Sequence, residues 1–114
     1  MVVSCGAKHS IMNVIMSLIN PGDEVIIPAP YWVSYPEMVK LAGGIPVFVR
    51  SSIDTNYKFD VDELRKLMNR RTKLIIFSSP CNPSGSVFSR EDLDAIAAAV
   101  LQHPDLVVIS DEIY

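Results

Sequence analysis

The chain has 114 residues, 49% of them hydrophobic and 20% charged, which gives it enough apolar side chains for one hydrophobic core. Its formal net charge of −3 provides no basic field for nucleic acid or anionic lipid, so we expect no nucleic acid and no membrane partner. The two cysteines, Cys5 and Cys81, lack metal-ligand spacing, and the sequence predicts neither a metal site nor a disulfide framework.

The hydrophobic pattern predicts strands and helices that alternate along the chain. Short apolar runs predict five strands, at residues 1–5, 24–28, 45–49, 73–78 and 106–109. Apolar residues at helical spacing predict four helices, at about 8–19, 34–41, 61–68 and 90–101. The order predicts an α/β fold with a mainly parallel sheet and helices on both faces. The last strand is apolar without alternation, which predicts burial on both of its faces.

Capping residues support three of the helix starts. Ser34 with Glu37 and Ser89 with Asp92 have the spacing of a capping box. Asp60 is likewise placed to cap the helix that follows it.

Unusual residues follow four of the predicted strands. They are the turn 6–8 (Gly-Ala-Lys), then Trp32, Asn82, and the pair Asp111 and Tyr114. The carboxyl ends of parallel strands meet at one edge of a sheet, and ligands of open α/β sheets bind there. Together these residues predict a ligand cleft.

Each of these residues also has an ordinary interpretation. Gly6 could hold an anion on the amides of a helix start or form a simple turn. Trp32 could stack on a flat ring or pack at the edge of the core, and Asn82 could bind a ligand or its own backbone. Asp111 could cap a helix that begins at Glu112. The apolar strand before Asp111 favours a functional interpretation of this carboxylate.

Five motifs in order carry a family resemblance. They are Gly-Ala-Lys (6–8), Pro-Gly-Asp-Glu-Val (21–25), Pro-Tyr-Trp-Val-Ser-Tyr-Pro-Glu (30–37), Asn-Pro-Ser-Gly (82–85) and Ser-Asp-Glu-Ile-Tyr (110–114). Over essentially all 114 residues the chain resembles the large domain of class I aminotransferases, which are fold-type-I pyridoxal phosphate enzymes. Within that family it is most similar to the bacterial and plastid aspartate and prephenate aminotransferase branch.

The resemblance implies pyridoxal 5'-phosphate as cofactor and a three-layer α/β/α domain. Gly6, Ala7 and Lys8 match the turn whose amides hold the cofactor phosphate. Asn82 and Tyr114 match the pair that bonds the phenolic oxygen of the cofactor.

Two further matches concern the cofactor ring. Trp32 matches the aromatic residue that stacks on the pyridine ring, and Asp111 matches the aspartate that keeps the ring nitrogen protonated. Lys8 also matches a position that meets the distal carboxylate of a dicarboxylic substrate. The resemblance therefore implies that Lys8, Trp32 and Asn82 contact substrate. It also implies cis peptide bonds before Pro30 and Pro83.

The resemblance further implies what the chain lacks. The Schiff-base lysine, the phosphate-binding arginine and the arginine for the substrate α-carboxylate match no residue here and lie beyond Tyr114. We therefore expect no catalytic residue in this chain and no transamination by it alone. Residues 1–114 are expected to be part of an incomplete cofactor-binding large domain, with no second domain present. In the family two later strands lie between the first and last strands predicted here, so we expect the strand at 1–5 to lack its usual neighbours. Ser84 stands where threonine is commoner, a small departure.

The implied function is transamination between a dicarboxylic amino acid of the aspartate or glutamate type and a 2-oxo acid. The expected setting is a cytoplasmic homodimer, with a plastid or another organelle as the alternative if a targeting peptide precedes the chain. A different hypothesis is a stand-alone, non-catalytic α/β module that binds a phosphorylated ligand. A third is a relative without the lysine that serves as a structural partner.

Overall fold

The computed structural model describes residues 1–114, in which helices and strands alternate along the chain. The elements are α1 (Ala7–Leu18), β1 (Glu24–Pro28), α2 (Ser34–Leu41), β2 (Ile45–Val49), the short 3-10 helix η1 (Ile53–Thr55), α3 (Val61–Leu67), β3 (Thr72–Ser78), α4 (Arg90–Val100) and β4 (Val107–Asp111). Four of the five predicted strands and all four predicted helices are confirmed within about one or two residues, the usual uncertainty of an element end. No helix has the length and hydropathy needed to cross a membrane.

The four strands form one parallel sheet in the order β2-β1-β3-β4. Ile26 of β1 pairs with Val47 of β2 on one side and with Ile75 of β3 on the other. β3 in turn pairs with β4, and Ser78 lies opposite Asp111 at the end of both strands. Because all four strands point the same way, their carboxyl ends lie at one edge of the sheet.

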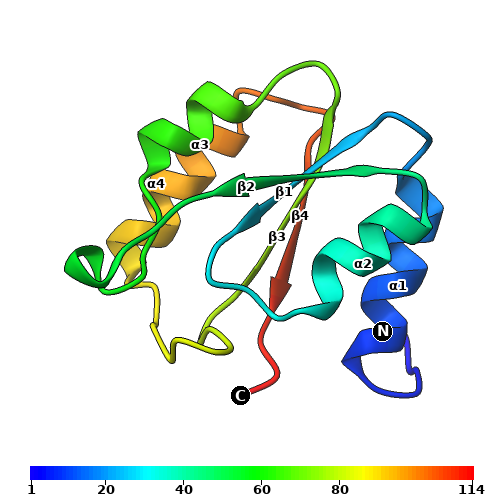
Figure 1. Ribbon diagram of the computed structural model, residues 1–114, viewed down its shortest axis with the longest axis horizontal. Coiled ribbons are helices and arrows are strands. Elements are labelled where there is room, and N and C mark those ends of the chain that lie inside the picture. The colour runs from blue at the N-terminus through cyan, green and yellow to red at the C-terminus, as the bar shows by residue number, and fades with distance from the viewer.

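Alternate side chains of the inner strands build two cores on opposite faces of the sheet. Val25 and Ile27 of β1 belong to the cluster under α1 and α2, whereas Ile26 belongs to the cluster with α3 and α4. Figure 1 shows the two helix pairs on either side of the sheet. Burial of each such isoleucine or valine contributes about 1.5–3 kcal/mol. The predicted three-layer arrangement is confirmed.

The predicted strand at residues 1–5 is wrong. Residues 1–4 adopt no regular structure, and the side chains of Met1, Val2 and Val3 are exposed. The apolar run has the composition of a strand, but a strand also needs a neighbouring backbone to pair with, and this segment has none in the structure. Gly6 instead closes a tight turn by donating its N–H to the Ser4 carbonyl at 2.9 Å.

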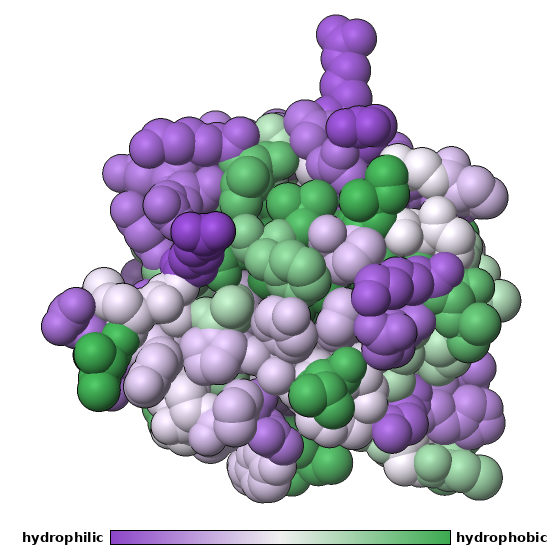
Figure 2. Space-filling view, viewed as in Figure 1, coloured by the Kyte–Doolittle hydropathy of each residue, from purple (hydrophilic) through white to green (hydrophobic).

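The expected burial of the last strand on both faces is also wrong. β4 lies at the edge of the sheet and pairs with β3 alone, and Val107 and Val108 are 39% and 38% exposed. The apolar composition of a strand does not reveal its place in the sheet. β2, at the opposite edge, likewise exposes Ile45 and Phe48. On the face of the molecule that β2 crosses in Figure 1, Figure 2 shows hydrophobic residues in green among more polar ones.

The expected capping box of α2 does not form. The capping position is taken by Val33, and the Ser34 side chain makes no capping hydrogen bond. Glu37 instead forms an ion pair with Lys40 at 2.7 Å. The helix begins one residue earlier than the serine indicates, so Ser34 already lies inside its first turn.

The other expected caps are confirmed. Asp60 accepts a hydrogen bond from the Asp62 N–H at 2.8 Å. Ser89 and Asp92 form the reciprocal capping box of α4. Asp92 also accepts a hydrogen bond from Lys58, which holds the pKa of this carboxyl below its ordinary value. The loop before α3 is therefore tied electrostatically to the start of α4.

We expect Asp92→Asn to lower the free energy of unfolding at neutral pH by roughly 0.2–1 kcal/mol, because asparagine keeps the cap but loses the charge. A carboxyl with a lowered folded-state pKa contributes stability above its unfolded pKa of about 3.9 and loses that contribution as the pH falls through its folded-state value. The difference between variant and wild type should therefore disappear in urea titrations run from about pH 7 to about pH 2. Lys58→Met should show the same loss at neutral pH. A difference that persists at the acid end would contradict this assignment.

Candidate functional site

One cavity of about 370 Å³ opens at the edge where the strands end. All seven residues that the sequence singles out as ligand-binding line it, and it has three further lining residues. The full set is Gly6, Ala7, Lys8, Trp32, Tyr35, Ser78, Asn82, Asp111, Ile113 and Tyr114. The structure thus brings together side chains from the start of α1, the loop before α2, the end of β3 with its turn, and the end of β4. Their individual roles stay predictions.

The turn before α1 forms one wall. Gly6 has φ 85° and ψ 165°, a conformation that essentially only glycine adopts. Its carbonyl accepts hydrogen bonds from the N–H groups of His9 and Ser10 at 3.1 and 3.4 Å. The first N–H groups of a helix, here those of Ala7 and Lys8, have no partners within the helix and can bind an anion. The first turn of α1 contains no acidic residue to occupy them.

Trp32 forms a second wall. Its indole packs against the core cluster of α1 and α2 and meets the ring of Tyr35 edge-on, with centroids 5.6 Å apart. The Lys8 Nζ lies 4.7 Å from the centre of the indole, within the range of a cation–π interaction. Trp32 borders the core, as one interpretation of the sequence expects, and it also lines the cavity, whereas its stacking on a flat ring stays a prediction. Lys8 brings a positive charge to this wall.

Asn82 and Tyr114 meet across the cavity. The Asn82 Nδ2 donates a hydrogen bond to the Tyr114 hydroxyl at 3.0 Å. The Asn82 side chain therefore does not hydrogen-bond only to its own turn, which was the alternative interpretation. The expected cis bonds Ala29–Pro30 and Asn82–Pro83 are both present, and Ser79–Pro80 is a third that the sequence did not indicate.

Asp111 is the last residue of β4. Its Oδ2 accepts a hydrogen bond from the Tyr35 hydroxyl at 2.6 Å. Residues 112–114 are not helical, so Asp111 does not cap a helix in this structure. Burial raises the pKa of Tyr35 well above the ordinary value of a tyrosine, and the hydrogen bond and charge of Asp111 raise it further. The phenol is therefore a donor at any ordinary pH.

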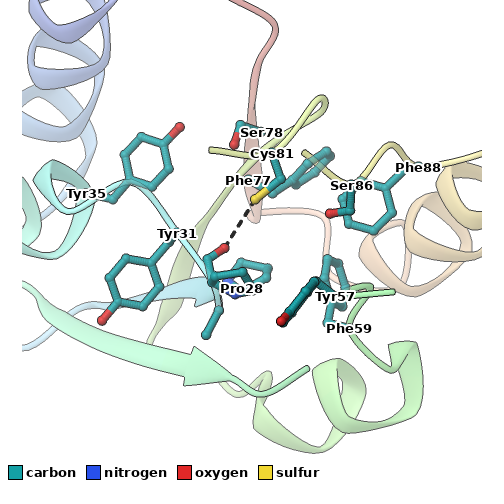
Figure 3. Close-up of a pocket in the computed structure, with 12 residues that line it drawn as sticks. Pro28, Tyr31, Tyr35, Tyr57, Phe59, Phe77, Ser78, Cys81, Ser86 and Phe88 are labelled. Carbon is teal, nitrogen blue, oxygen red and sulfur yellow. Dashed lines mark hydrogen bonds between the residues drawn. The ribbon is translucent and has the colours of Figure 1, made fainter. Parts of the chain in front are cut away.

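A second and much smaller space borders the cavity. Figure 3 shows it between aromatic rings that include Tyr57, Phe77 and Phe88. The Cys81 thiol points across it and donates to the Pro30 carbonyl at 3.3 Å. Its volume of about 10 Å³ is close to the minimum for one water molecule. This smaller space therefore cannot hold an organic ligand, whereas the larger cavity has room for one.

Sequence reasoning missed Tyr35 and Ser78. Tyr35 stands three positions after Trp32 at the start of α2, a spacing that places two side chains on one side of a helical turn. Ser78 is the polar last residue of an apolar strand, the same signal that identified Asp111. Its Oγ accepts from the Asn82 N–H at 3.4 Å. Both residues support a neighbour that the sequence did identify.

Comparisons with known proteins show the family of the chain. The sequence matches the family described as aminotransferase class I and II over residues 1–114. It is 47% identical to the aspartate/prephenate aminotransferase of Nitrosomonas europaea, with 98% of this chain and 28% of that protein covered. It is 50% identical to the bifunctional aspartate aminotransferase and glutamate/aspartate-prephenate aminotransferase of Petunia hybrida, over 98% of this chain and 23% of that protein.

The fold agrees with a solved structure as well. The structure of the aspartate aminotransferase from Thermus thermophilus with maleate superposes with a TM-score of 0.88 at 42% identity. The match covers 92% of this chain and 27% of that one. The chain therefore spans well under a third of the length of these relatives.

We expect Gly6→Ala to open the turn at the start of α1, because an alanine at this φ and ψ costs about 1–3 kcal/mol. The Cβ itself has open space, with no atom within 4 Å, so the cost is backbone strain alone. Amide exchange at His9 and Ser10, which bond the Gly6 carbonyl, should accelerate by about tenfold or more if that cost falls on the local opening.

Gly22→Ala is the matched control. Gly22 has a similar φ of 92° and equally open space, but it lies beyond the other end of α1. It should leave the exchange of His9 and Ser10 unchanged relative to the rest of the chain. Equal acceleration in both variants would contradict a local effect of Gly6.

Proposed function

Because the chain belongs to the class I and II aminotransferase family, we propose that residues 1–114 are part of the cofactor-binding large domain of a pyridoxal-phosphate-dependent aminotransferase. The complete protein exchanges an amino group between a dicarboxylic amino acid, of the aspartate or glutamate type, and a 2-oxo acid. One observation carries this proposal: a carboxylate at the end of a strand shares a cavity with a glycine turn, an indole and an amide–phenol pair.

The donor set of the cavity suits pyridoxal phosphate. A phosphate needs N–H donors, which the helix start at Ala7 and Lys8 offers. A flat ring needs an apolar wall, which Trp32 offers. The cofactor also has a basic ring nitrogen and a phenolic oxygen, for which Asp111 and the Asn82–Tyr114 pair provide a carboxylate and hydrogen-bond donors.

When bound, pyridoxal phosphate accepts electrons from the substrate carbon, most effectively when its ring nitrogen is protonated. In the proposed mechanism Asp111 holds the proton at that nitrogen through a charge-assisted hydrogen bond. Asn82 and Tyr114 orient the ring through its phenolic oxygen, and the turn 6–8 anchors the phosphate. Trp32 covers the ring and excludes water from that face.

The dicarboxylic substrate is proposed from Lys8. Its ammonium group lines the cavity and is held near the indole of Trp32, where a distal carboxylate can reach it. Trp32 and Asn82 are proposed as further substrate contacts. The Thermus relative, which matches 92% of this chain, was solved with maleate, a dicarboxylate. That structure supports a dicarboxylic substrate for the complete protein.

The groups that complete catalysis are proposed to lie in the remainder of the protein. They are the catalytic lysine and the arginines for the phosphate and the substrate α-carboxylate. We also propose a homodimer and a cytoplasmic location, both by analogy with the family. A stand-alone module that binds a phosphorylated ligand is not favoured, because the match extends along the whole chain to enzymes much longer than it.

The direct test uses the complete protein that contains this chain. It should bind pyridoxal phosphate stoichiometrically and transfer the amino group of aspartate or glutamate to a 2-oxo acid. Cofactor binding is measured by absorbance after dialysis and transfer by product assay. A complete protein that binds no cofactor would refute the proposed function.

Asp111→Asn in the complete protein should lower kcat by roughly 10²–10³-fold, the usual effect of removing a group that stabilises transition-state charge. Glu112→Gln is the matched control, because that neighbouring carboxylate bonds Ser110 and does not line the cavity. Steady-state kinetics with aspartate distinguish the two variants. Equal losses would argue against a specific role of Asp111.

Lys8→Met should lower kcat/KM for aspartate by about 10–100-fold, the loss expected for one hydrogen bond to a charged group. The value for alanine as amino donor should change little, because alanine has no distal carboxylate. Methionine keeps the backbone N–H of the turn and most of the side-chain length. Lys73→Met, on β3 away from the cavity, should leave both values unchanged. A parallel loss with both amino donors would contradict the substrate role of Lys8.

A further inference from the structure

Tyr35 links α2 to the end of β4. It lies in the first turn of α2, which covers β1 and β2, yet its hydroxyl reaches Asp111 at the end of β4, two strands away from β1. The side chain is 1% exposed and is among the largest fully buried ones in the chain. A buried phenol needs a hydrogen-bond partner, and here the partner is a carboxylate in the candidate site.

The bond uses only one oxygen of Asp111. Oδ2 accepts from the Tyr35 hydroxyl at 2.6 Å, and the Asp111 side chain makes no other hydrogen bond in the structure. An ionised carboxylate can accept on both oxygens. The second oxygen is therefore free for a donor inside the cavity that Asp111 lines.

The bond also has a fixed direction. The raised pKa of Tyr35, caused first by burial and then by Asp111, keeps the phenol protonated. Tyr35 is therefore always the donor and Asp111 always the acceptor. Such a bond fixes the plane of the carboxylate and stabilises the negative charge on it.

We propose that Tyr35 is the positioning residue for Asp111: it holds one carboxylate oxygen so that the other faces the ring nitrogen of the bound cofactor. This inference rests on the proposed function. The segment 32–35 at the start of α2 then places both sides of the cofactor site, because the Tyr35 N–H also donates to the Trp32 carbonyl at 3.1 Å. A small shift of this segment would move the stacking ring and the carboxylate together.

The test is Tyr35→Phe in the complete protein loaded with pyridoxal phosphate labelled with ¹⁵N in the ring. The variant leaves the carboxylate without its fixed orientation, so we expect the ¹⁵N chemical shift to move from the pyridinium value toward that of neutral pyridine. The dissociation constant of the cofactor should rise by roughly two- to tenfold, the range for loss of one hydrogen bond. Neither readout depends on activity.

Tyr31→Phe is the matched control. Tyr31 is the preceding tyrosine of the same segment, but its ring stacks on Phe48 at 5.0 Å and it does not line the main cavity. Figure 3 shows the hydroxyl groups of Tyr31 and Tyr35 pointing in opposite directions. Its removal should leave the ¹⁵N shift and the cofactor affinity as in the wild type.

The outcomes separate this inference from the proposed function. A wild type that binds cofactor with a protonated nitrogen, together with a changed Tyr35→Phe variant, supports both. An unchanged ¹⁵N shift in a folded Tyr35→Phe variant overturns the positioning role and leaves the proposed function standing. A wild type that binds no cofactor overturns both.

A second measurement needs neither cofactor nor the Tyr35 variant. With tyrosine ¹³C-labelled at the ring carbon that bears the hydroxyl, NMR follows the ionisation of Tyr35 in the complete apo protein. Asp111→Asn removes the charge and the acceptor that raise the pKa of Tyr35, so the phenol should ionise at lower pH than in the wild type. This result would support the contact even if Tyr35→Phe does not fold. An unchanged titration would overturn the proposal.

Discussion

The parallel pairing of the four strands is the constraint on which the site depends. Parallel strands end at the same edge, and each is followed by a loop or helix start that begins there. The inner strands β1 and β3 bury isoleucines on both faces, so the position of this edge is fixed by two hydrophobic cores at once. Residues as distant in sequence as Trp32, after β1, and Asp111, at the end of β4, therefore line one cavity. The parallel topology brings the residues of the proposed site together, and the individual side chains then determine its chemistry.

The segment 32–35, at the start of α2, contributes two separate contacts to the site. Trp32, just before α2, and Tyr35, in its first turn, meet edge to face. Trp32 forms a wall of the cavity, and Tyr35 bonds the Asp111 carboxylate that lines it. Tyr35 is also part of the core cluster that α1 and α2 share with β1 and β3. The site is thus anchored in the core on this side, whereas the half-buried Asn82 and the exposed Tyr114 close it on the other. The buried side of the site is therefore the one that would orient the cofactor ring in the proposed function.

Local patterns in the sequence were enough to predict β1, β2 and β3 and the caps at Asp60 and Ser89, because these depend on neighbours within a few residues. The family motifs identified the residues of the cavity, although their roles stay predictions. The strand at residues 1–5 was predicted wrongly because composition cannot show whether a partner strand is present. The exposure of β4 was missed because its place at the sheet edge is a tertiary property. The bond between Tyr35 and Asp111 joins positions 76 residues apart, a separation that no periodicity detects.

The cavity also has a consequence for how the chain folds. Its lining comes from Gly6 near one end of the chain and from Tyr114 at the other, so any partly folded state without β4 has no site. Sheets built from pairings distant in sequence form slowly. A ligand that binds only when β3 and β4 are paired stabilises that part of the sheet by mass action. The cofactor proposed for this site would then stabilise the folded sheet in addition to its chemical role.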